Sequence, residues 1–156
     1  MKKLLLALIG TMILTLSACT SKEGKLKKQA EEIGKAKFME VLKKEADDGL
    51  GQSDWLRQAY VEYVGNRSEV EAENVNFIGE TAATATLVVK TYSPKMRQTL
   101  ISIAAKVDPD KARRFNFGEA LVLIRRQTGQ NTETDYQPLT VLKFTKSGEK
   151  WVADNP

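Results

Sequence analysis

One cysteine and no histidine limit the chemistry that this 156-residue chain can perform. With Cys19 alone, the chain can form neither an internal disulfide nor a zinc site built from several Cys and His ligands. The lack of histidine removes the imidazole general base and excludes hydrolysis by a Ser-His-Asp triad. Carboxylates, Lys, Tyr, Ser and Thr are left for chemistry. Since no glycine-rich phosphate loop, metal motif or EF-hand occurs, we expect no cofactor.

The position of Cys19 indicates a different chemistry, namely modification by lipid. The chain opens with Met-Lys-Lys and continues with a mostly apolar run over residues 4–16. A stable transmembrane helix needs about 20 apolar residues. The run is therefore too short for a good permanent span and is typical of the apolar region of a secretory signal. Two small residues, Ser17 and Ala18, separate it from the cysteine.

The segment LSAC, residues 16–19, resembles the lipobox of bacterial lipoproteins. The resemblance implies that the thiol of Cys19 receives a diacylglyceryl group and that cleavage falls between Ala18 and Cys19. It also implies acylation of the new amino group. A single acyl chain binds a membrane marginally, whereas two or more hold it firmly. Two alternatives stay open: an ordinary signal peptide in which Cys19 is incidental, and an uncleaved anchor.

The same resemblance implies a location and a domain organisation. Residues 1–18 form a lipoprotein signal peptide, and residues 19–156 form a single domain tethered to membrane lipid through Cys19. The expected location is the cell envelope. Thr20, not aspartate, follows the cysteine, and in a Gram-negative host this implies delivery to the periplasmic face of the outer membrane.

The charge of the chain gives no sign of nucleic-acid binding. Its net charge is +4, from 24 Lys and Arg against 20 Asp and Glu. Removal of Lys2 and Lys3 with the signal leaves 22 against 20, a net charge of +2. Nucleic-acid-binding proteins usually present a clustered basic face, so we expect no nucleic-acid partner. The apolar share of 42% suits one folded domain and is too high for a disordered chain.

Apolar spacing and capping residues predict three helices. Apolar residues recur at helical spacing over residues 22–48, within a highly charged segment. Ser53 is a candidate N-cap for a second helix over 54–64, and Ser93 for a third over 94–106. Four lysines lie near the lipid at the start of the first helix, where they could contact anionic headgroups or form a solvated face: Lys22, Lys25, Lys27 and Lys28.

Residues that alternate in polarity predict the strands. Residues 70–78 and 81–92 are typical of a β-hairpin. A long strand is predicted over 115–128, with a hairpin partner over 136–145 and a last short strand over 150–153. Helices to one side of an antiparallel sheet make an α+β fold.

The closing segment LKFTKSGEKWVADNP, residues 142–156, is similar to the last hairpin of small NTF2-like and cystatin-like domains. With the order of the elements, the resemblance implies a cone in which N-terminal helices pack on a curved antiparallel sheet. Trp151 would pack the concave face of that sheet onto the helices. Trp55, Tyr60 and Tyr63 share neighbouring faces of the second helix; they are core residues or, with Trp151, line a candidate ligand pocket.

Two arginine pairs and one carboxylate are the other candidate site residues. Arg113-Arg114 and Arg125-Arg126 could capture phosphate or carboxylate groups, because arginine offers a planar fork of donors. Neighbouring residues of a strand face opposite ways, so we expect solvent-facing salt bridges from these arginines instead. Glu119, on the same predicted strand, is a candidate pocket carboxylate.

Three classes of function agree with these observations. The first is a membrane-anchored envelope lipoprotein whose domain binds an envelope protein or an apolar ligand without catalysis. The second is a carrier of a small apolar ligand or lipid in a cone-shaped pocket, which requires a closed apolar cavity. The third is an enzyme that uses carboxylate and tyrosine groups, which requires a buried carboxylate near Tyr or Lys with a shifted pKa. An interaction module requires a filled core and an exposed apolar patch.

Overall fold

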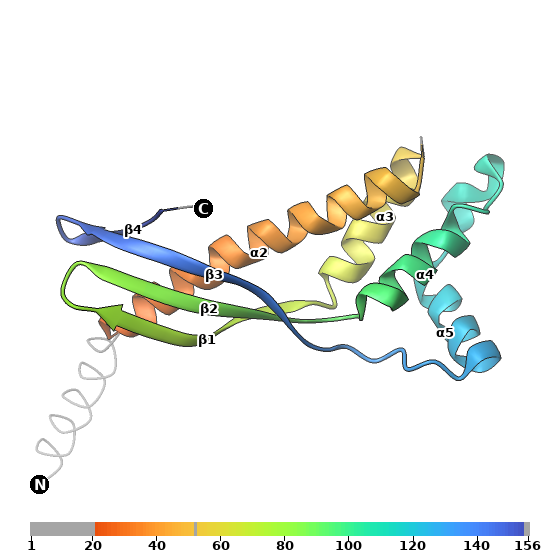
Figure 1. The fold of residues 1–156 in the computed structure, drawn as a ribbon. Coiled ribbons are helices and arrows are strands. Elements are labelled where there is room, and N and C mark those ends of the chain that lie inside the picture. The colour runs from red at the N-terminus through yellow and green to blue at the C-terminus, as the bar shows by residue number, and fades with distance from the viewer. Residues whose placement is uncertain (1–20, 52, 155–156) are drawn as a thin grey trace, which may run out of the picture.

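The structure is a computed structural model that describes residues 21–154 apart from residue 52. Helices pack on one open, antiparallel sheet, which confirms the predicted α+β class (Figure 1). The predicted cleavage and lipidation sites, Ala18 and Cys19, lie outside the described residues. The described elements are α2 (Lys22–Gly49), α3 (Asp54–Gly65), β1 (Glu69–Ile78), β2 (Ala82–Thr91), α4 (Pro94–Ala104), the 3-10 helix η1 (Pro109–Arg114), α5 (Phe117–Thr128), β3 (Asp135–Ser147) and β4 (Lys150–Ala153).

The sheet has the order β1-β2-β3-β4, and every neighbouring pair is antiparallel. Along β2, the side chains alternate between buried and half-buried, as the two-residue period of the sequence predicts. The buried apolar side chains of β2 face α2, and they are Ala83, Ala85, Leu87 and Val89. None of the described helices covers the opposite face of the sheet (Figure 1).

The long helix α2 joins the sheet to the other helices. Ser21 caps it, since its hydroxyl accepts a hydrogen bond from the amide of Gly24 at 3.0 Å. At 1.5 Å per residue, its 28 residues span about 42 Å. Its buried residues recur every four positions and form one stripe: Leu26, Ala30, Gly34, Phe38, Leu42 and Ala46. Within residues 21–154, no helix combines the length and the apolar character needed to cross a membrane.

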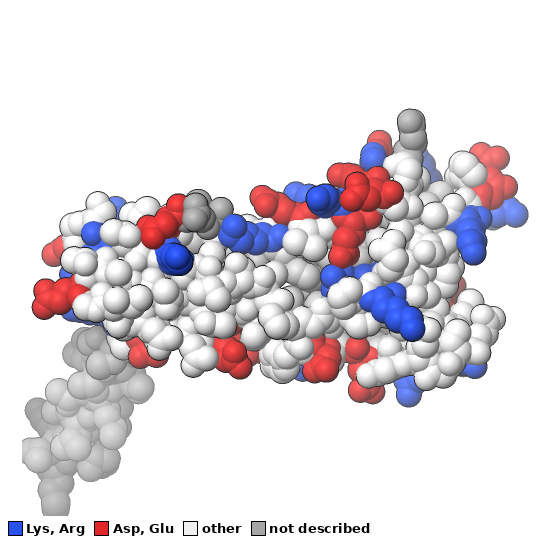
Figure 2. Space-filling view, viewed as in Figure 1, with Lys and Arg blue, Asp and Glu red and all other residues white. Residues whose placement is uncertain are grey.

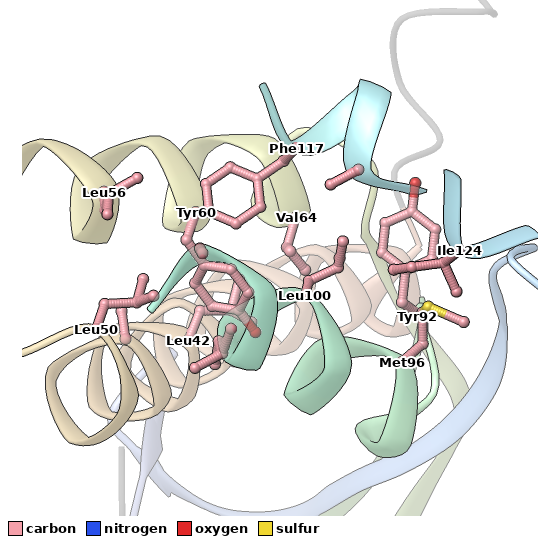
Figure 3. Close-up of a cluster of buried hydrophobic side chains, with 14 of the residues drawn as sticks. Leu42, Leu50, Leu56, Tyr60, Val64, Tyr92, Met96, Leu100, Phe117 and Ile124 are labelled. Carbon is pink, nitrogen blue, oxygen red and sulfur yellow. The ribbon is translucent and has the colours of Figure 1, made fainter. Parts of the chain in front are cut away.

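The stripe of α2 contributes to two hydrophobic clusters. The first half of the stripe packs on the sheet in what we call the sheet-end cluster, built around Leu26, Leu87 and Phe144. The second half packs against α3, α4 and α5 in the helical-end cluster, which includes Tyr60 and Leu100 (Figure 3). These five side chains are almost fully buried. The two ends of the molecule are therefore held to each other by one continuous helix.

The segment 115–128, predicted as a strand, is mostly the helix α5, so that prediction is wrong. Asn116 caps the helix, because its side-chain oxygen accepts hydrogen bonds from the amides of Gly118 and Glu119. Gly129 ends it in the left-handed conformation, with a φ of 64°. The buried residues of α5 follow helical spacing, and they are Phe117, Ala120 and Ile124. A face at this spacing can be buried against α3 and α4, which an alternating strand could not do.

The correction changes the surroundings of three candidate residues. Arg125 and Arg126 lie in the last turn of α5 and both are exposed, so the argument from opposite faces of a strand does not apply to them. Positive side chains at this end of a helix interact favourably with its dipole. Glu119 lies in the first turn of the same helix and is exposed, where a negative charge is favourable for the same reason.

Candidate functional site

The structure places the four aromatic residues of the candidate pocket in different surroundings. Tyr60 is fully buried in the helical-end cluster, and Tyr63 is half-buried one turn later on α3. Both rings pack on Phe117, with centroids 5.7 and 5.9 Å away. Trp55 is 49% exposed in the first turn of α3. Trp151 lies at the far end of the molecule, in β4, against the sheet-end cluster.

The helical end contains a buried polar network that sequence analysis did not identify. Arg97 of α4 is 6% exposed, and its Nε donates to both carboxylate oxygens of Glu45 on α2, at 3.0 and 3.2 Å. Its Nη2 donates to Oε1 of Glu45 at 2.9 Å, and its Nη1 donates to the carbonyl of Tyr92 at 2.8 Å. The hydroxyl of Tyr60, from α3, donates to Oε2 of Glu45 at 2.8 Å. Three helices therefore meet at one carboxylate.

The network contains a carboxylate beside a tyrosine, as an enzyme that uses carboxylate and tyrosine groups would require. Its groups, however, are already hydrogen-bonded to one another. Burial, followed by the hydrogen bond to Glu45, raises the pKa of Tyr60 above its usual value. Tyr60 is therefore a neutral donor that is closed off from solvent. The guanidinium fork of Arg97 is occupied by Glu45 and by the Tyr92 carbonyl. The network therefore acts as a link between α2, α3 and α4.

A stack of aromatic rings lies beside this network. The rings of Tyr63 and Tyr92 are parallel within 3°, with centroids 6.3 Å apart. The guanidinium carbon of Arg67 lies 4.0 Å from the centroid of Tyr63, a cation–π contact. Burial raises the pKa of Tyr92 to about 12, and the neighbouring Tyr63 hydroxyl adds to the effect. Tyr92 therefore stays protonated to a higher pH in the folded chain than in the unfolded chain.

The raised pKa of Tyr92 predicts a loss of stability in alkali. Below about pH 10, Tyr92 is protonated in both the folded and the unfolded chain, so its full contribution to the free energy of unfolding is present. Between about pH 10 and pH 12, the unfolded chain releases the proton first, so the free energy of unfolding falls. We expect Tyr92→Phe to abolish roughly 1–2 kcal/mol of this fall, measured by urea unfolding across that range. Equal pH profiles for the native protein and the variant would contradict the prediction.

The other end of the molecule has a cleft of about 600 Å³, which we call the tip cleft. Its lining residues come from the start of α2 and from the hairpins β1–β2 and β3–β4. The start of α2 and the turns of these hairpins lie at the same end of the molecule (Figure 1). Its aromatic wall is formed by Phe77 and Trp151, whose ring centroids are 5.7 Å apart. The side-chain amide of Gln29 on α2 donates to the carbonyl of Trp151 at 3.1 Å, which fixes β4 to the helix.

Charged side chains of both signs line the tip cleft. Figure 2 shows that positive and negative side chains occur together at this end of the molecule. Lys22, Lys25 and Lys146 contribute the positive charge, and Glu80 and Glu149 the negative. The charge of the cleft is therefore close to balanced, with an excess of one lysine. Its rim resembles neither a strongly cationic phosphate site nor an acidic metal site.

Exposed apolar side chains surround the tip cleft on both faces of the sheet. Phe77 is 42% exposed on the face that carries α2. Ile78 and Val152, 60% and 51% exposed, lie on the uncovered face. Ile78 pairs with Ala82, Ala82 with Thr145, and Thr145 with Val152. Ile78 and Val152 are therefore the two ends of one row across the four strands. The tip therefore exposes apolar side chains on both faces of the sheet.

Among the described residues, no group of three or more His, Cys, Asp or Glu side chains is placed to hold a metal ion. Comparisons of the chain with protein-family models, with curated proteins and with solved structures found no match. The residues and their geometry are therefore the basis for any functional proposal.

Proposed function

We propose that the protein is a membrane-anchored lipoprotein of the bacterial cell envelope whose folded domain binds a partner without catalysing a reaction. The observation that carries the proposal is the lipobox-like segment 16–19, placed directly after a basic start and a short apolar run. Acyl chains on Cys19 would hold the domain outside the cytosol. In a Gram-negative host, the domain would lie on the periplasmic face of the outer membrane.

The packing of the described residues supports an interaction module over a carrier. The space between α2 and the sheet, where a carrier would hold its ligand, is filled by side chains such as Leu26, Leu87 and Phe144, each 1% exposed. The hollow at the junction of α2 and α3 and the tip cleft are both open to solvent and have charged rims. An apolar ligand held in such an open cleft would stay largely in contact with water, which removes most of the gain from binding it.

Exposed apolar residues on the helical end support the same proposal. Val122 and Leu123 of α5 are 48% and 53% exposed and lie next to each other on the outer side of the helix. An envelope protein that packs on α5 would remove these side chains from water, at about 25 cal/mol per Å² of apolar surface buried. The partner bound by the domain is therefore proposed to be a protein, and not a small substrate.

Mass spectrometry of the protein purified from its native membrane tests the lipid anchor. We expect the native chain to begin at Cys19 and to carry a diacylglyceryl group and a further acyl chain. Cys19→Ser should remove all acyl mass and leave residues 1–18 attached, because both modification and cleavage depend on the thiol. Thr20→Ser is the matched control and should be lipidated as the native protein is. A native Cys19 with a free thiol would contradict the proposal.

A further inference from the structure

We propose that the tip of the sheet is a membrane-docking surface that inserts apolar side chains into the bilayer holding the acyl chains of Cys19. The surface consists of the tip cleft with Phe77 and Trp151, and of the neighbouring Ile78 and Val152. The occupant is the interfacial layer of a phospholipid bilayer. The inference rests on the proposed lipid anchor and adds an orientation of the domain to it.

Chain length places the tip next to the anchor. Lys22 is the first residue of α2 and lines the tip cleft. It follows Cys19 by three residues, and consecutive Cα atoms are 3.80 Å apart, so the two Cα atoms are separated by at most about 11 Å. If Cys19 is held at the membrane surface, the tip cleft is the part of the domain nearest to that surface. There is too little chain between them for the tip to stand clear of the headgroups.

The residue types at the tip are those that proteins place at a membrane interface. Tryptophan is enriched at the level of the headgroups, where an apolar ring with one polar group is favourable. Lysines such as Lys22 and Lys25 can lay their aliphatic stems along the apolar layer and keep the ammonium group in water. Ile78 and Val152 provide exposed aliphatic surface on the uncovered face. Binding at an interface increases with the apolar area that is buried.

The nearly balanced charge of the side chains that line the tip cleft predicts which lipids docking requires. Three lysines and two glutamates line the cleft, so attraction to anionic headgroups is weak. Apolar insertion is therefore the main source of binding, and docking should be similar on zwitterionic bilayers and on bilayers with added anionic lipid.

Docking by the tip also carries the helical end away from the bilayer. α2 spans about 42 Å from the tip to the helical end, and α3, α4 and α5 gather beyond the sheet (Figure 1). Trp55, at the start of α3, marks that distant end. The exposed pair Val122 and Leu123 lies there as well, on α5, where a partner protein could reach it.

The two tryptophans of the chain allow a direct test, because one marks each end. The lipidated, full protein is placed in vesicles of zwitterionic phospholipid with brominated acyl chains, which quench nearby indole rings. In Trp55→Phe only Trp151 emits, and in Trp151→Phe only Trp55 emits. We expect the quenching of Trp151 to be several times that of Trp55. Equal quenching of both would mean that the domain lies flat, and would overturn the proposal.

A pair of valine substitutions provides the matched control. Val152 and Val141 both lie on the uncovered face and are similarly exposed, at 51% and 56%, but only Val152 belongs to the tip. In the Trp55→Phe background, Val152→Glu should reduce the quenching of Trp151 at least twofold, while Val141→Glu should leave it unchanged. Circular dichroism of both variants checks that each is folded. An equal effect of the two substitutions would overturn the role of the tip.

The outcomes separate docking from anchoring. Acyl mass on Cys19 together with an unquenched Trp151 would overturn docking and leave the lipid anchor intact. A native chain without acyl mass would overturn both proposals. Quenching of Trp151 that occurs only with anionic lipid would overturn apolar insertion and indicate a purely electrostatic contact.

Discussion

Replacement of Arg97 by methionine is expected to lower the free energy of unfolding by about 3 kcal/mol, measured by urea denaturation. Methionine fills the space of the aliphatic stem but removes every donor of the guanidinium group. The carboxylate of Glu45 is then left partly buried without its positive partner, and the carbonyl of Tyr92 loses its hydrogen bond. Breaking a buried ion pair costs about 3–5 kcal/mol. A cost at the low end of this range is expected for Arg97→Met, because the Glu45 side chain is 24% exposed and water can partly solvate its charge.

A second ion pair in the same chain is the control for Arg97. Arg57 approaches Asp47 at 3.6 Å on the surface, where the two side chains are 31% and 65% exposed, and it also pairs with Asp54. Exposed pairs contribute about 0–1 kcal/mol, so Arg57→Met should change the unfolding free energy by less than about 1 kcal/mol. Similar losses for the two arginine variants would show that the buried network has no special role.

The network itself can be separated from the loss of charge. Arg97→Lys keeps a positive charge but cannot bind both Glu45 oxygens and the Tyr92 carbonyl at once, so an intermediate loss is expected. The double variant Glu45→Leu/Arg97→Met should recover part of the loss of Arg97→Met, because it leaves no unpaired charge. Recovery will be incomplete, since the Tyr60 hydroxyl then lacks its acceptor.

Local signals in the sequence were sufficient for most helices and for the first hairpin. Ser53 and Ser93 are the N-caps of α3 and α4, as predicted, and their hydroxyls accept from the amides of Leu56 and Met96. The alternation of β2 places Ala83, Ala85 and Leu87 on the buried face, as predicted. These signals succeed because capping and alternation depend on residues only a few positions apart.

The error at α5 arose although a local signal was present. Asn116 followed by Glu119 is the spacing of an N-cap and the third helical residue, and Gly129 stands where a helix ends. The apolar residues between them also fit a strand, because short apolar runs do not distinguish the two periods. Burial of Phe117 and Ile124 against α3 and α4 decides in favour of the helix, and that choice depends on tertiary packing.

The network of Arg97 and the tip could not be predicted from local patterns. Glu45 and Arg97 are 52 residues apart, and nothing near either of them names the other as its partner. The tip depends on the register of four strands, which brings Ile78 and Val152 into one row beside the start of α2. The position of Lys22 near the lipid follows from the sequence, but the hairpin turns that line the tip cleft with it are more than 50 positions away along the chain. Long-range pairing therefore creates both features.

Substitution of Gly34 by valine is expected to lower the free energy of unfolding by about 3 kcal/mol, measured by urea denaturation. Gly34 lies where α2 crosses the sheet. A Cβ atom there would lie 2.5 Å from Cδ1 of Leu87 and 2.9 Å from Cγ1 of Val70, well inside van der Waals contact. Because Leu87 is 1% exposed, it has little room to move away. The two further methyl groups of valine would push α2 off the sheet.

Alanine at the same position separates collision from helix propensity. Gly34→Ala gains about 1 kcal/mol of helix propensity, so a net loss of stability would show that the close approach to Leu87 outweighs that gain. Leu87→Ala removes the Cδ1 atom that the added Cβ would approach. The loss of unfolding free energy in the double variant Gly34→Ala/Leu87→Ala should therefore be smaller than the sum of the losses in the two single variants. If the losses of the two single variants add up to the loss of the double variant, the proposed clash with Leu87 is contradicted. Non-additivity would mean that Gly34 sets the distance between α2 and the sheet, and with it the position of Lys22 and Lys25 at the tip cleft.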